Sequence, residues 1–523
     1  MQTDPATLTR DAGQQLHPFH GGLRLRHHKQ ISCQVPVLRP PLPGRLVVPL
    51  LQHSGAALSA TVRAGEVVLK GQVIGRCADA PDPVIHAPTS GVVEEVAKHA
   101  MAHPSGRPGP CIVIRSDGQD QWCALHAVPD WRTAAPEALI EAIGSAGIVG
   151  LGGAVFPTRA KAEYGRWAGI HTLIINGAEC EPYISCDEML MRERPDAIVL
   201  GARILQRASG AERTVIAIED QMGAVRKALE AAIRRSGDPA LTLARIPAIY
   251  PEGGERQLIE VLTGQEVPDG GLPADLGLAC QNVATAAATA AAVTEGKPLI
   301  ERYVTVTGNG VRQPRNLLAL IGTPVSQLVE QCGGYSDDVA RLVVGGPMMG
   351  YPLASDAEPV VKASNCILAL THADIRPRQD EMPCIRCGEC ARVCPARLLP
   401  QQLHWDIVNG LWEDAHEHKL AACIECGCCD FVCPSHIPLV EWFRFGKDEI
   451  RRLEAERLLA DHARERYEAR EARLERITRE RGERIARRKQ ALQDEAGQRK
   501  RITAAIERAA GRKQGSAADG DGP

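Results

Sequence analysis

The chain has 523 residues, too many for one hydrophobic core, so we expect several domains. Its formal net charge of −3 excludes nucleic-acid binding driven by bulk positive charge. No run of about 18 uncharged apolar residues occurs, and residues 1–10 are polar, so we expect neither a membrane-spanning helix nor a signal peptide. The expected location is the cytoplasm, with any membrane association peripheral.

The N-terminal region, residues 1–125, has the pattern of short strands separated by glycine and proline. Segments 64–75 and 86–96 resemble the two halves of a lipoyl- or biotinyl-type barrel-sandwich hybrid. Carriers of that type place a modifiable lysine between the halves, whereas residues 76–82 contain none. We therefore expect the fold to be shared and its role to be structural.

Helical and strand patterns alternate over residues 130–300, which predicts an α/β domain with a largely parallel sheet. The predicted helices are Ala135–Ser145, Asp196–Ala208, Gly223–Arg235 and an alanine-rich run from Asn282 to about Gly296. The predicted strands are His171–Ile175, Thr214–Ile218 and Leu241–Ile246.

A smaller module follows at residues 301–371, with strands expected at Arg302–Thr307 and Leu342–Val344 and little helical pattern. Residues 375–445 form a cysteine-rich region. Together these regions indicate a multidomain protein of mixed α/β and α+β class.

The C-terminal region, residues 446–523, is dense in Glu, Arg, Lys and Ala from Glu449 to Arg512. This composition predicts long helices with many charge pairs four residues apart. Such helices are either solvated or lie on anionic lipid or partner subunits. Residues 515–523 have a composition typical of disorder.

Eight of the 18 cysteines lie in two runs with the spacing Cys-x₂-Cys-x₂-Cys-x₃-Cys-Pro, which is that of bacterial two-cluster ferredoxins. In this arrangement three thiolates hold one [4Fe–4S] cluster and the fourth holds the other. Cluster 1 is assigned to Cys384, Cys387, Cys390 and Cys433. Cluster 2 is assigned to Cys394, Cys423, Cys426 and Cys429. The alternative is a pair of zinc sites, but zinc prefers two separated Cys-x₂-Cys pairs.

Four further segments indicate nucleotide chemistry. A glycine-rich loop from Gly150 to Lys161 lets the backbone approach a phosphate or flat ring, and its lysine supplies a cation. Residues 176–182 place acids after a strand, where ribose hydroxyls bind in α/β folds. Segments 250–255 and 281–285 follow. A simple turn and a solvated loop are the alternatives for the first two.

These four segments, in this order, resemble the flavin- and NADH-binding subunit of respiratory complex I. The whole chain, over residues 17–445, is more similar to the RnfC family of the Rnf (Rsx) electron-transport complexes, including segments 19–22 and 343–350. The resemblance implies five parts: a barrel-sandwich hybrid at 1–125, a Rossmann-like FMN/NADH domain at 130–300, a β-grasp (SLBB) module at 301–371, a two-cluster ferredoxin domain at 375–445 and a charged helical tail at 446–523.

The resemblance also implies roles for single residues. Those expected at the FMN phosphate or ring are Gly150, Gly152, Gly153 and Lys161, with Asn176, Asn282 and Thr285 as further FMN contacts. Those expected to face NADH or its ribose are Glu179, Glu181 and Glu255. Gly254 stands where complex I has an acidic residue.

The implied function is that of a peripheral subunit of an ion-translocating NADH:ferredoxin oxidoreductase. Electrons would pass between NADH, non-covalent FMN and two [4Fe–4S] clusters, to or from membrane-bound subunits at the cytoplasmic side of the bacterial inner membrane. Ferredoxin or flavodoxin would be an indirect partner. The alternatives are a soluble NADH-dependent cobalamin reductase, a group that lacks the N-terminal barrel, and a flavin-free electron-relay scaffold, against which segments 150–161 and 176–182 argue.

Overall fold

The computed structural model describes residues 16–77, 83–375, 377 and 379–515. The predictions for residues 1–10, for most of the 76–82 connection and for the end of the tail therefore lie outside the described residues. The chain divides into two compact units, Met1–Arg444 and Phe445–Pro523. No helix in the described part of the chain combines the length and the apolar character needed to cross a bilayer.

Two small sheets form the N-terminal part of the first unit. One is antiparallel in the order β1 (Arg45–Pro49), β7 (Gly109–Ser116), β6 (Gly91–His99) and β3 (Val67–Val68). The other joins β2 (Ser59–Ala60), β4 (Val73–Arg76) and β5 (Val84–His86). Alternate apolar residues of both sheets, such as Val48, Ile74 and Ile112, share one buried core. This packing of one sheet on the other is the sandwich expected from the two half-repeats.

The next part is a parallel four-stranded sheet in the order β10 (Leu241–Ile246), β9 (Arg213–Glu219), β8 (Thr172–Gly177) and β11 (Leu278–Asn282). Its helices are α1 (Pro136–Ser145), α2 (Thr158–Ala168), α3 (Cys186–Glu193), α4 (Pro195–Ser209), α5 (Gly223–Ser236), α6 (Glu255–Thr263) and α7 (Val283–Glu295), with the short helix η3 (Pro273–Leu276).

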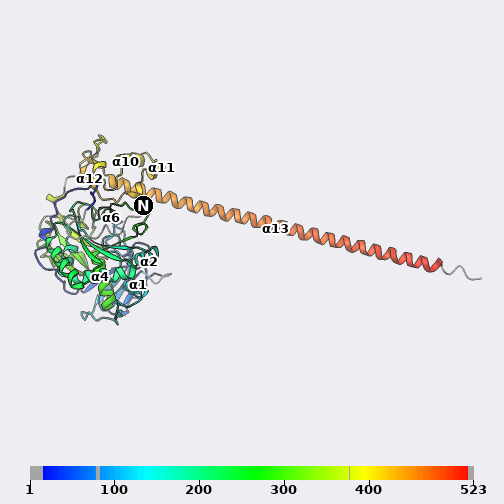
Figure 1. Ribbon diagram of the computed structural model, residues 1–523, viewed down its shortest axis with the longest axis horizontal. Coiled ribbons are helices and arrows are strands. Elements are labelled where there is room, and N and C mark those ends of the chain that lie inside the picture. The colour runs from blue at the N-terminus through cyan, green and yellow to red at the C-terminus, as the bar shows by residue number, and fades with distance from the viewer. Residues whose placement is uncertain (1–15, 78–82, 376, 378, 516–523) are drawn as a thin grey trace, which may run out of the picture. The chain divides into compact units, whose positions relative to one another are not determined.

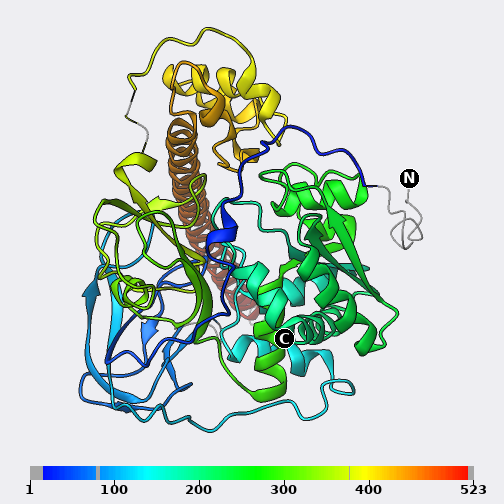
Figure 2. The same cartoon turned by 90° about the vertical axis from the view of Figure 1, so that its left-hand side faces the viewer.

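Helices cover both faces of this sheet (Figure 2). Leu173 and Ile175 of β8 point into a large core with α1, α4 and α7, whereas Ile174 points into a second core with α6. Successive strand residues face opposite sides, so a strand that is buried on both faces must be continuously apolar. That requirement explains the apolar runs from which these strands were predicted.

A mixed five-stranded sheet follows, in the order β13 (Arg315–Leu320), β12 (Glu301–Thr307), β16 (Cys366–Thr371), β14 (Val339–Val344) and β15 (Tyr351–Pro352). It carries one short helix, α8 (Val325–Glu330), and the turn of helix η4 (His372–Asp374). Upstream, η2 (Lys29–Ile31) belongs to the segment that leads into the first sheet.

The cysteine-rich region is built from short helices: α9 (Glu389–Val393), α10 (Pro400–Val408), α11 (Trp412–Glu417), η5 (Leu420–Ala422) and α12 (Cys428–Val432). Its two cysteine runs have the same backbone at equivalent positions. Gly388 and Gly427 have φ values of 78° and 76°, and each precedes a five-residue helix. Arg386 and Glu425, at matching places in the two runs, are also left-handed. The region is therefore an internal structural repeat.

Helix α13 (Leu439–Gly515; Figure 1) supplies the described part of the second unit. Its side chains from Phe445 to Gly511 are mostly exposed. Pairs such as Arg452 with Glu449 and Glu456 lie three and four residues apart along it.

Candidate functional site

The sheet order locates a crevice in the α/β part. The chain goes from β8 to β9 and β10 on one side and returns to β11 on the other, so the connections reverse between β8 and β11. Ligands of open α/β sheets bind at such reversals, beyond the carboxyl ends of the strands. Asn176 and Asn282 are paired at those two ends. A cavity of about 450 Å³, here called the crevice cavity, lies there.

The glycine-rich loop forms one wall of the crevice cavity. Gly150 donates to the Phe156 carbonyl at 2.8 Å and accepts from the Val155 amide at 3.1 Å, which closes the loop on itself. The Leu151 amide donates to Oγ1 of the buried Thr285 at 2.9 Å, which fixes the loop to α7. Gly152 lies against Asn282, where a Cβ would come within 3.5 Å of the asparagine Cβ. Small residues therefore keep this wall thin and close to any occupant.

Lys161 of α2 and Glu255 of α6 face each other across the cavity, with Nζ and Oε1 2.5 Å apart. The two side chains are 28% and 40% exposed. Pairs this accessible contribute little net stability, so the lysine can turn to an anion at small cost. The pair therefore leaves a cation available to a phosphate.

The two asparagines hold the backbone around the cavity. Asn176 donates to the Gly253 carbonyl at 2.8 Å and accepts from the Ala178 amide at 2.9 Å. Asn282 caps α7 by accepting from the Ala284 amide at 2.7 Å, and it donates to Asp187 at 2.6 Å. Both amides are thus fixed in orientation before any ligand arrives.

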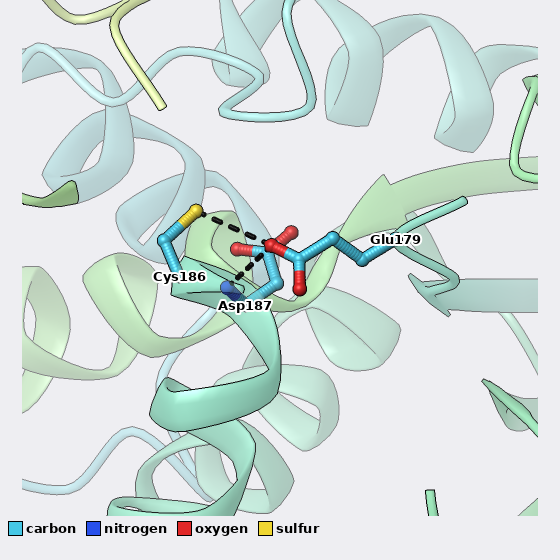
Figure 3. Close-up of side chains that lie close together, drawn as sticks. All are labelled: Glu179, Cys186 and Asp187. Atoms are coloured by element: carbon cyan, nitrogen blue, oxygen red, sulfur yellow. Dashed lines mark hydrogen bonds between the residues drawn. The ribbon is translucent and has the colours of Figure 1, made fainter. Parts of the chain in front are cut away.

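Glu179 is buried, 7% exposed, and its carboxylate caps helix α3 (Figure 3). It accepts from the Asp187 amide at 2.9 Å, from the Glu188 amide at 3.2 Å and from the Cys186 thiol at 3.4 Å. An anion at a helix N-terminus is favoured by the free amides and the helix dipole. Although Glu179, Cys186 and Asp187 lie within 4.8 Å of one another, hydrogen bonds already occupy the Glu179 carboxylate.

Lys29 balances the Glu179 carboxylate from far upstream in the chain. Its Nζ lies 3.5 Å from Glu179 and 4.0 Å from Glu219, and all three side chains are buried. Burial alone lowers the pKa of Lys29, but the Glu179 and Glu219 carboxylates outweigh that effect and raise the pKa above its ordinary value. Lys29 is therefore charged, and its interactions with Glu179 and Glu219 hold the 176–182 loop in place.

The Glu181 side chain contacts the loop that follows β14 in the five-stranded sheet. Its carboxylate accepts from the Met349 amide at 2.7 Å and from the Met348 amide at 3.3 Å. Gly346 is required beside it, because a Cβ there would lie 2.3 Å from Glu181 Oε2. Burial raises the pKa of Glu181 to about 7, against the effect of the two amides. Glu181 thus ties two domains together at the edge of the cavity.

The cysteines gather in two pockets. One is lined by Cys384, Cys387, Cys390 and Cys433. The other is lined by Cys394, Cys423, Cys426 and Cys429, with Cys428. Each pocket therefore takes three thiols from one run and the fourth from the other. Protein groups already reach the sulfurs: the Leu398 amide donates to Cys394 Sγ and the Glu425 amide to Cys423 Sγ, both at 3.4 Å. Such bonds tune cluster potentials.

One zinc ion and a [4Fe–4S] cubane set different distances between the thiolates that bind them. Tetrahedral zinc with bonds of about 2.3 Å draws its sulfur ligands to within about 4 Å of one another. Among the residues that the structure describes, three potential ligand atoms within 4.8 Å of one another are found at Glu179, Cys186 and Asp187, not in the cysteine runs. A cubane binds each thiolate at a different iron, so it accepts the wider spacing.

The cysteine region meets the crevice cavity directly. Ile424, inside the second run, lines both the cavity and the pocket of Cys394, Cys423, Cys426 and Cys429. Tyr250, another cavity residue, donates its hydroxyl to the Cys426 carbonyl at 2.6 Å. Both residues also share a buried cluster with Met348. Only the second of the two cysteine pockets has a lining residue in common with the cavity, within the described residues.

Eight of the ten residues assigned to FMN or NADH line the cavity: Gly150, Gly152, Lys161, Asn176, Glu179, Glu181, Glu255 and Asn282. Gly153 and Thr285 do not; Thr285 is buried behind the loop and positions it. Sequence reasoning missed Asp187, Gln281, Asn365 and Ile424 as lining residues. Gln281 lies beside the Asn282 motif, so its position could have been inferred. Asn365 and Ile424 come from other domains, and no local pattern marks them.

Family models match three parts of the chain. Residues 143–291 match the Nuo51 FMN-binding domain, residues 17–119 the RnfC barrel sandwich hybrid domain and residues 303–352 the SLBB domain. Most of the residues that line the crevice cavity lie within the first match, and the cavity has the thin glycine wall, cation and oriented amides that an FMN requires. The chain is thus a multidomain protein built around an FMN-binding domain.

Comparison with related proteins identifies the family within this class. The C subunit of the ion-translocating oxidoreductase complex of Pseudomonas aeruginosa is 48% identical over 461 residues, covering 88% of this chain and 59% of that protein. The protein of the same name from Pectobacterium atrosepticum is 45% identical over 473 residues, covering 90% of this chain and 67% of its own length. This chain belongs to that family, the RnfC proteins. It spans about three fifths of the length of the first of these relatives.

Among solved structures, an NAD⁺-reducing [NiFe]-hydrogenase in its H₂-reduced state aligns with a TM-score of 0.43 and 20% identity, covering 60% of this chain and 65% of that one.

Proposed function

We propose that the chain is the peripheral electron-transfer subunit of an ion-translocating NADH:ferredoxin oxidoreductase complex. It would hold FMN non-covalently in the crevice cavity and two [4Fe–4S] clusters in the cysteine pockets. Its partners would be membrane-bound subunits at the cytoplasmic face of the bacterial inner membrane, with ferredoxin or flavodoxin indirect. The names of the relatives and the RnfC family models support this proposal.

The observation that carries the proposal is the position of Ile424. One side chain lines both the crevice cavity and the pocket proposed for cluster 2. A redox path requires its centres to be close, and this contact brings two candidate centres together across one residue. Tyr250 reinforces the contact through the Cys426 carbonyl.

The same contact supports an order along the path. Cluster 2 would be adjacent to the flavin, because its pocket shares a wall with the cavity. Cluster 1 would be the outer one, and two of its ligands, Cys384 and Cys387, are exposed. The outer cluster would exchange electrons with the membrane-bound partner.

When bound, a flavin exchanges a hydride as well as single electrons, and cubane clusters exchange single electrons. The chain's own residues supply position and electrostatics. Lys161 would meet the phosphate, Gly150, Gly152 and the loop fixed by Thr285 would lie along the flavin, and Asn176 and Asn282 would hold the surrounding backbone. Glu255 is the remaining half-exposed carboxylate able to accept from a ribose.

The test uses the full chain, prepared anaerobically with FMN, iron and sulfide, and two cysteine variants as a matched pair. NADH is added and cluster reduction is followed by EPR. In Cys384→Ser, which removes a ligand of the outer cluster, NADH should still reduce cluster 2. In Cys423→Ser, which disrupts cluster 2, the outer cluster should stay oxidised on the same timescale.

Dithionite reduction of both variants serves as the control, because it reaches either cluster without the flavin. Equal reduction of the surviving cluster by NADH in both variants would show the order to be wrong. A wild-type chain that binds no FMN and retains its clusters would instead favour a flavin-free relay.

A further inference from the structure

A second cavity lies behind the glycine-rich loop. Its volume is about 430 Å³, which is in the range of small-molecule sites. Its lining comes from helices α3, α4 and α7, from strands β12 and β13 and from neighbouring loops, and it includes none of the ten residues assigned to FMN or NADH. Leu151 lines both this rear cavity and the crevice cavity, so the loop is the partition between them.

The floor of the rear cavity is flat and apolar. Four alanines of α7 form it, spaced so that they share one helix face: Ala284, Ala287, Ala288 and Ala291. The helix packs tightly against α4 elsewhere, where a Cβ on Gly201 would lie 1.7 Å from the Ala286 carbonyl oxygen. The alanine face itself borders the cavity, with Trp122 and Tyr303 among the other lining residues. Aromatic rings beside a smooth floor suit a planar guest.

Five cations line the rear cavity against one acid, Glu301. Three of the cations already have carboxylate partners: Arg39 with Glu301 at 2.7 Å, Lys70 with Asp120 at 2.5 Å and Lys297 with Glu295 at 2.5 Å. The other two, Arg194 and Arg302, have no ion pair within the described part of the chain. The lining therefore carries two guanidinium groups outside any salt bridge, of which Arg302 also lies in the field of the buried Asp187 and Glu179 carboxylates.

Arg302 is the more informative of the two, because it is only 3% exposed. It donates to the Leu151 carbonyl at 2.7 Å and to the Lys362 carbonyl, but its Nε has no hydrogen-bond partner among the described residues. Burial lowers the pKa of Arg302, and Cys186 with the Asp187 and Glu179 carboxylates offsets only part of that effect. A buried guanidinium without a salt bridge carries a desolvation cost, and an anion beside it would reduce that cost.

We propose that the rear cavity is a binding site for a phosphate monoester that carries a planar aromatic ring, of the size of a mononucleotide. A phosphate monoester has close to two negative charges at neutral pH, which matches the two unpaired guanidinium groups. Guanidinium groups also match phosphate geometry with two parallel donors. The ring lies on the alanine floor beside Tyr303 and Trp122.

This site goes beyond the proposed electron path, which uses none of the charged residues of the rear cavity. The two cavities meet at one residue of the shared loop, Leu151. Thr285 accepts from the Leu151 amide while Arg302 donates to the Leu151 carbonyl. An occupant that draws Arg302 away therefore acts on the loop that borders the crevice cavity.

The test measures binding of 5′-AMP to the full chain by calorimetry. Arg194→Glu reverses the exposed free charge, and Ala288→Leu fills the floor without removing a hydrogen bond. The matched controls are Arg234→Glu and Ala231→Leu on α5, outside both cavities. The circular-dichroism spectrum and the thermal unfolding midpoint report that each variant is folded.

We expect both cavity variants to weaken AMP binding at least about tenfold, Arg194→Glu by removing a charge-assisted phosphate contact and Ala288→Leu by occupying the space of the ring. In both controls the dissociation constant for AMP should stay within about twofold of the wild-type value. Absence of AMP binding to the folded wild-type chain would overturn the proposal. Binding that the cavity variants leave unchanged would overturn it too, since AMP would then bind outside the rear cavity. Neither outcome depends on electron transfer, so failure of the proposed function would be seen separately.

Discussion

The contact between Tyr250 and the second cysteine run can be tested by removing one oxygen atom. Tyr250→Phe keeps the ring, which is 2% exposed, and deletes the hydroxyl that donates to the Cys426 carbonyl at 2.6 Å. The carbonyl then lies buried without this donor. Leaving a buried acceptor unpaired costs about 1–3 kcal/mol. This loss destabilises the contact between the cavity and residues 423–429 in the folded chain, so the 423–429 loop should open locally more often.

Hydrogen exchange measures this opening. Each 1.4 kcal/mol corresponds to about a factor of ten, so exchange of the amides in a 420–433 peptide should rise by roughly five- to 150-fold. Peptides of the N-terminal sheets should not change. Tyr164→Phe is the control, because Tyr164 is 37% exposed and its hydroxyl makes no hydrogen bond within the described residues. If the 420–433 peptide exchanges at the wild-type rate in Tyr250→Phe, the hydroxyl does not hold the loop and the reasoning is refuted.

Three further predictions concern the residues around the cavity. Thr285→Val removes the acceptor of the Leu151 amide and should weaken FMN binding roughly ten- to 100-fold, measured by fluorescence quenching. Thr289→Val should leave FMN binding unchanged, since the buried Thr289 hydroxyl has no partner among the described residues. Equal effects of the two variants would contradict the role of Thr285 in holding the loop. Lys29→Met removes the cation beside the buried Glu179 and Glu219 carboxylates and should lower the free energy of unfolding by about 3–5 kcal/mol in denaturant titrations. Lys161→Met, in a half-exposed pair, should lower it by about 0–1 kcal/mol. Similar losses in the two variants would refute the role of Lys29. Burial lowers the pKa of Lys362 to about 7 from 10.5, so between these pH values the Lys362 amine is protonated in the unfolded chain and neutral in the folded one. The stability of the folded chain should therefore rise with pH from about 7 to 10.5, and Lys362→Met should lack this rise. If the thermal midpoints of variant and wild type differ by the same amount at about pH 6.5 and about pH 9, the prediction is wrong.

Local signals were enough for the elements whose pattern is uninterrupted. The apolar strands β8, β9 and β10 and helices α1, α4 and α5 lie within two residues of their predicted limits. Helix α7 begins at the cap that Asn282 provides and ends at Gly296, whose φ of 68° suits glycine. These elements follow from residues that are neighbours in sequence.

Helices α3 and α6 were not predicted, because what stabilises them is distant. The first turn of α3 is acidic, and its free amides are satisfied by Glu179, seven and more residues earlier. Helix α6 begins inside a segment that was interpreted only as a nucleotide motif. In the same way, the resemblance to the complex I subunit implied that Glu179 faces NADH. The residue lines the crevice cavity, and its carboxylate also caps α3 and pairs with Lys29, 150 residues upstream. A one-dimensional pattern contains no information on such partners.

The cysteine assignments rest on spacing alone, and the two pockets group the thiols in the same crossed pairs. The grouping of the thiols follows from spacing because each run is a short loop whose geometry is local, and their role as cluster ligands stays a prediction. The position of the second run against the crevice cavity, through Ile424 and Tyr250, depends on packing between domains and could not be foreseen.

The most direct measurement is EPR of the full chain, prepared anaerobically with bound FMN and frozen after addition of either NADH or dithionite. Dithionite should produce the spectra of two reduced [4Fe–4S] clusters, and NADH should reduce at least the cluster beside the crevice cavity. A chain that binds zinc in place of iron, or whose clusters respond to dithionite but never to NADH although FMN is bound, would contradict the account.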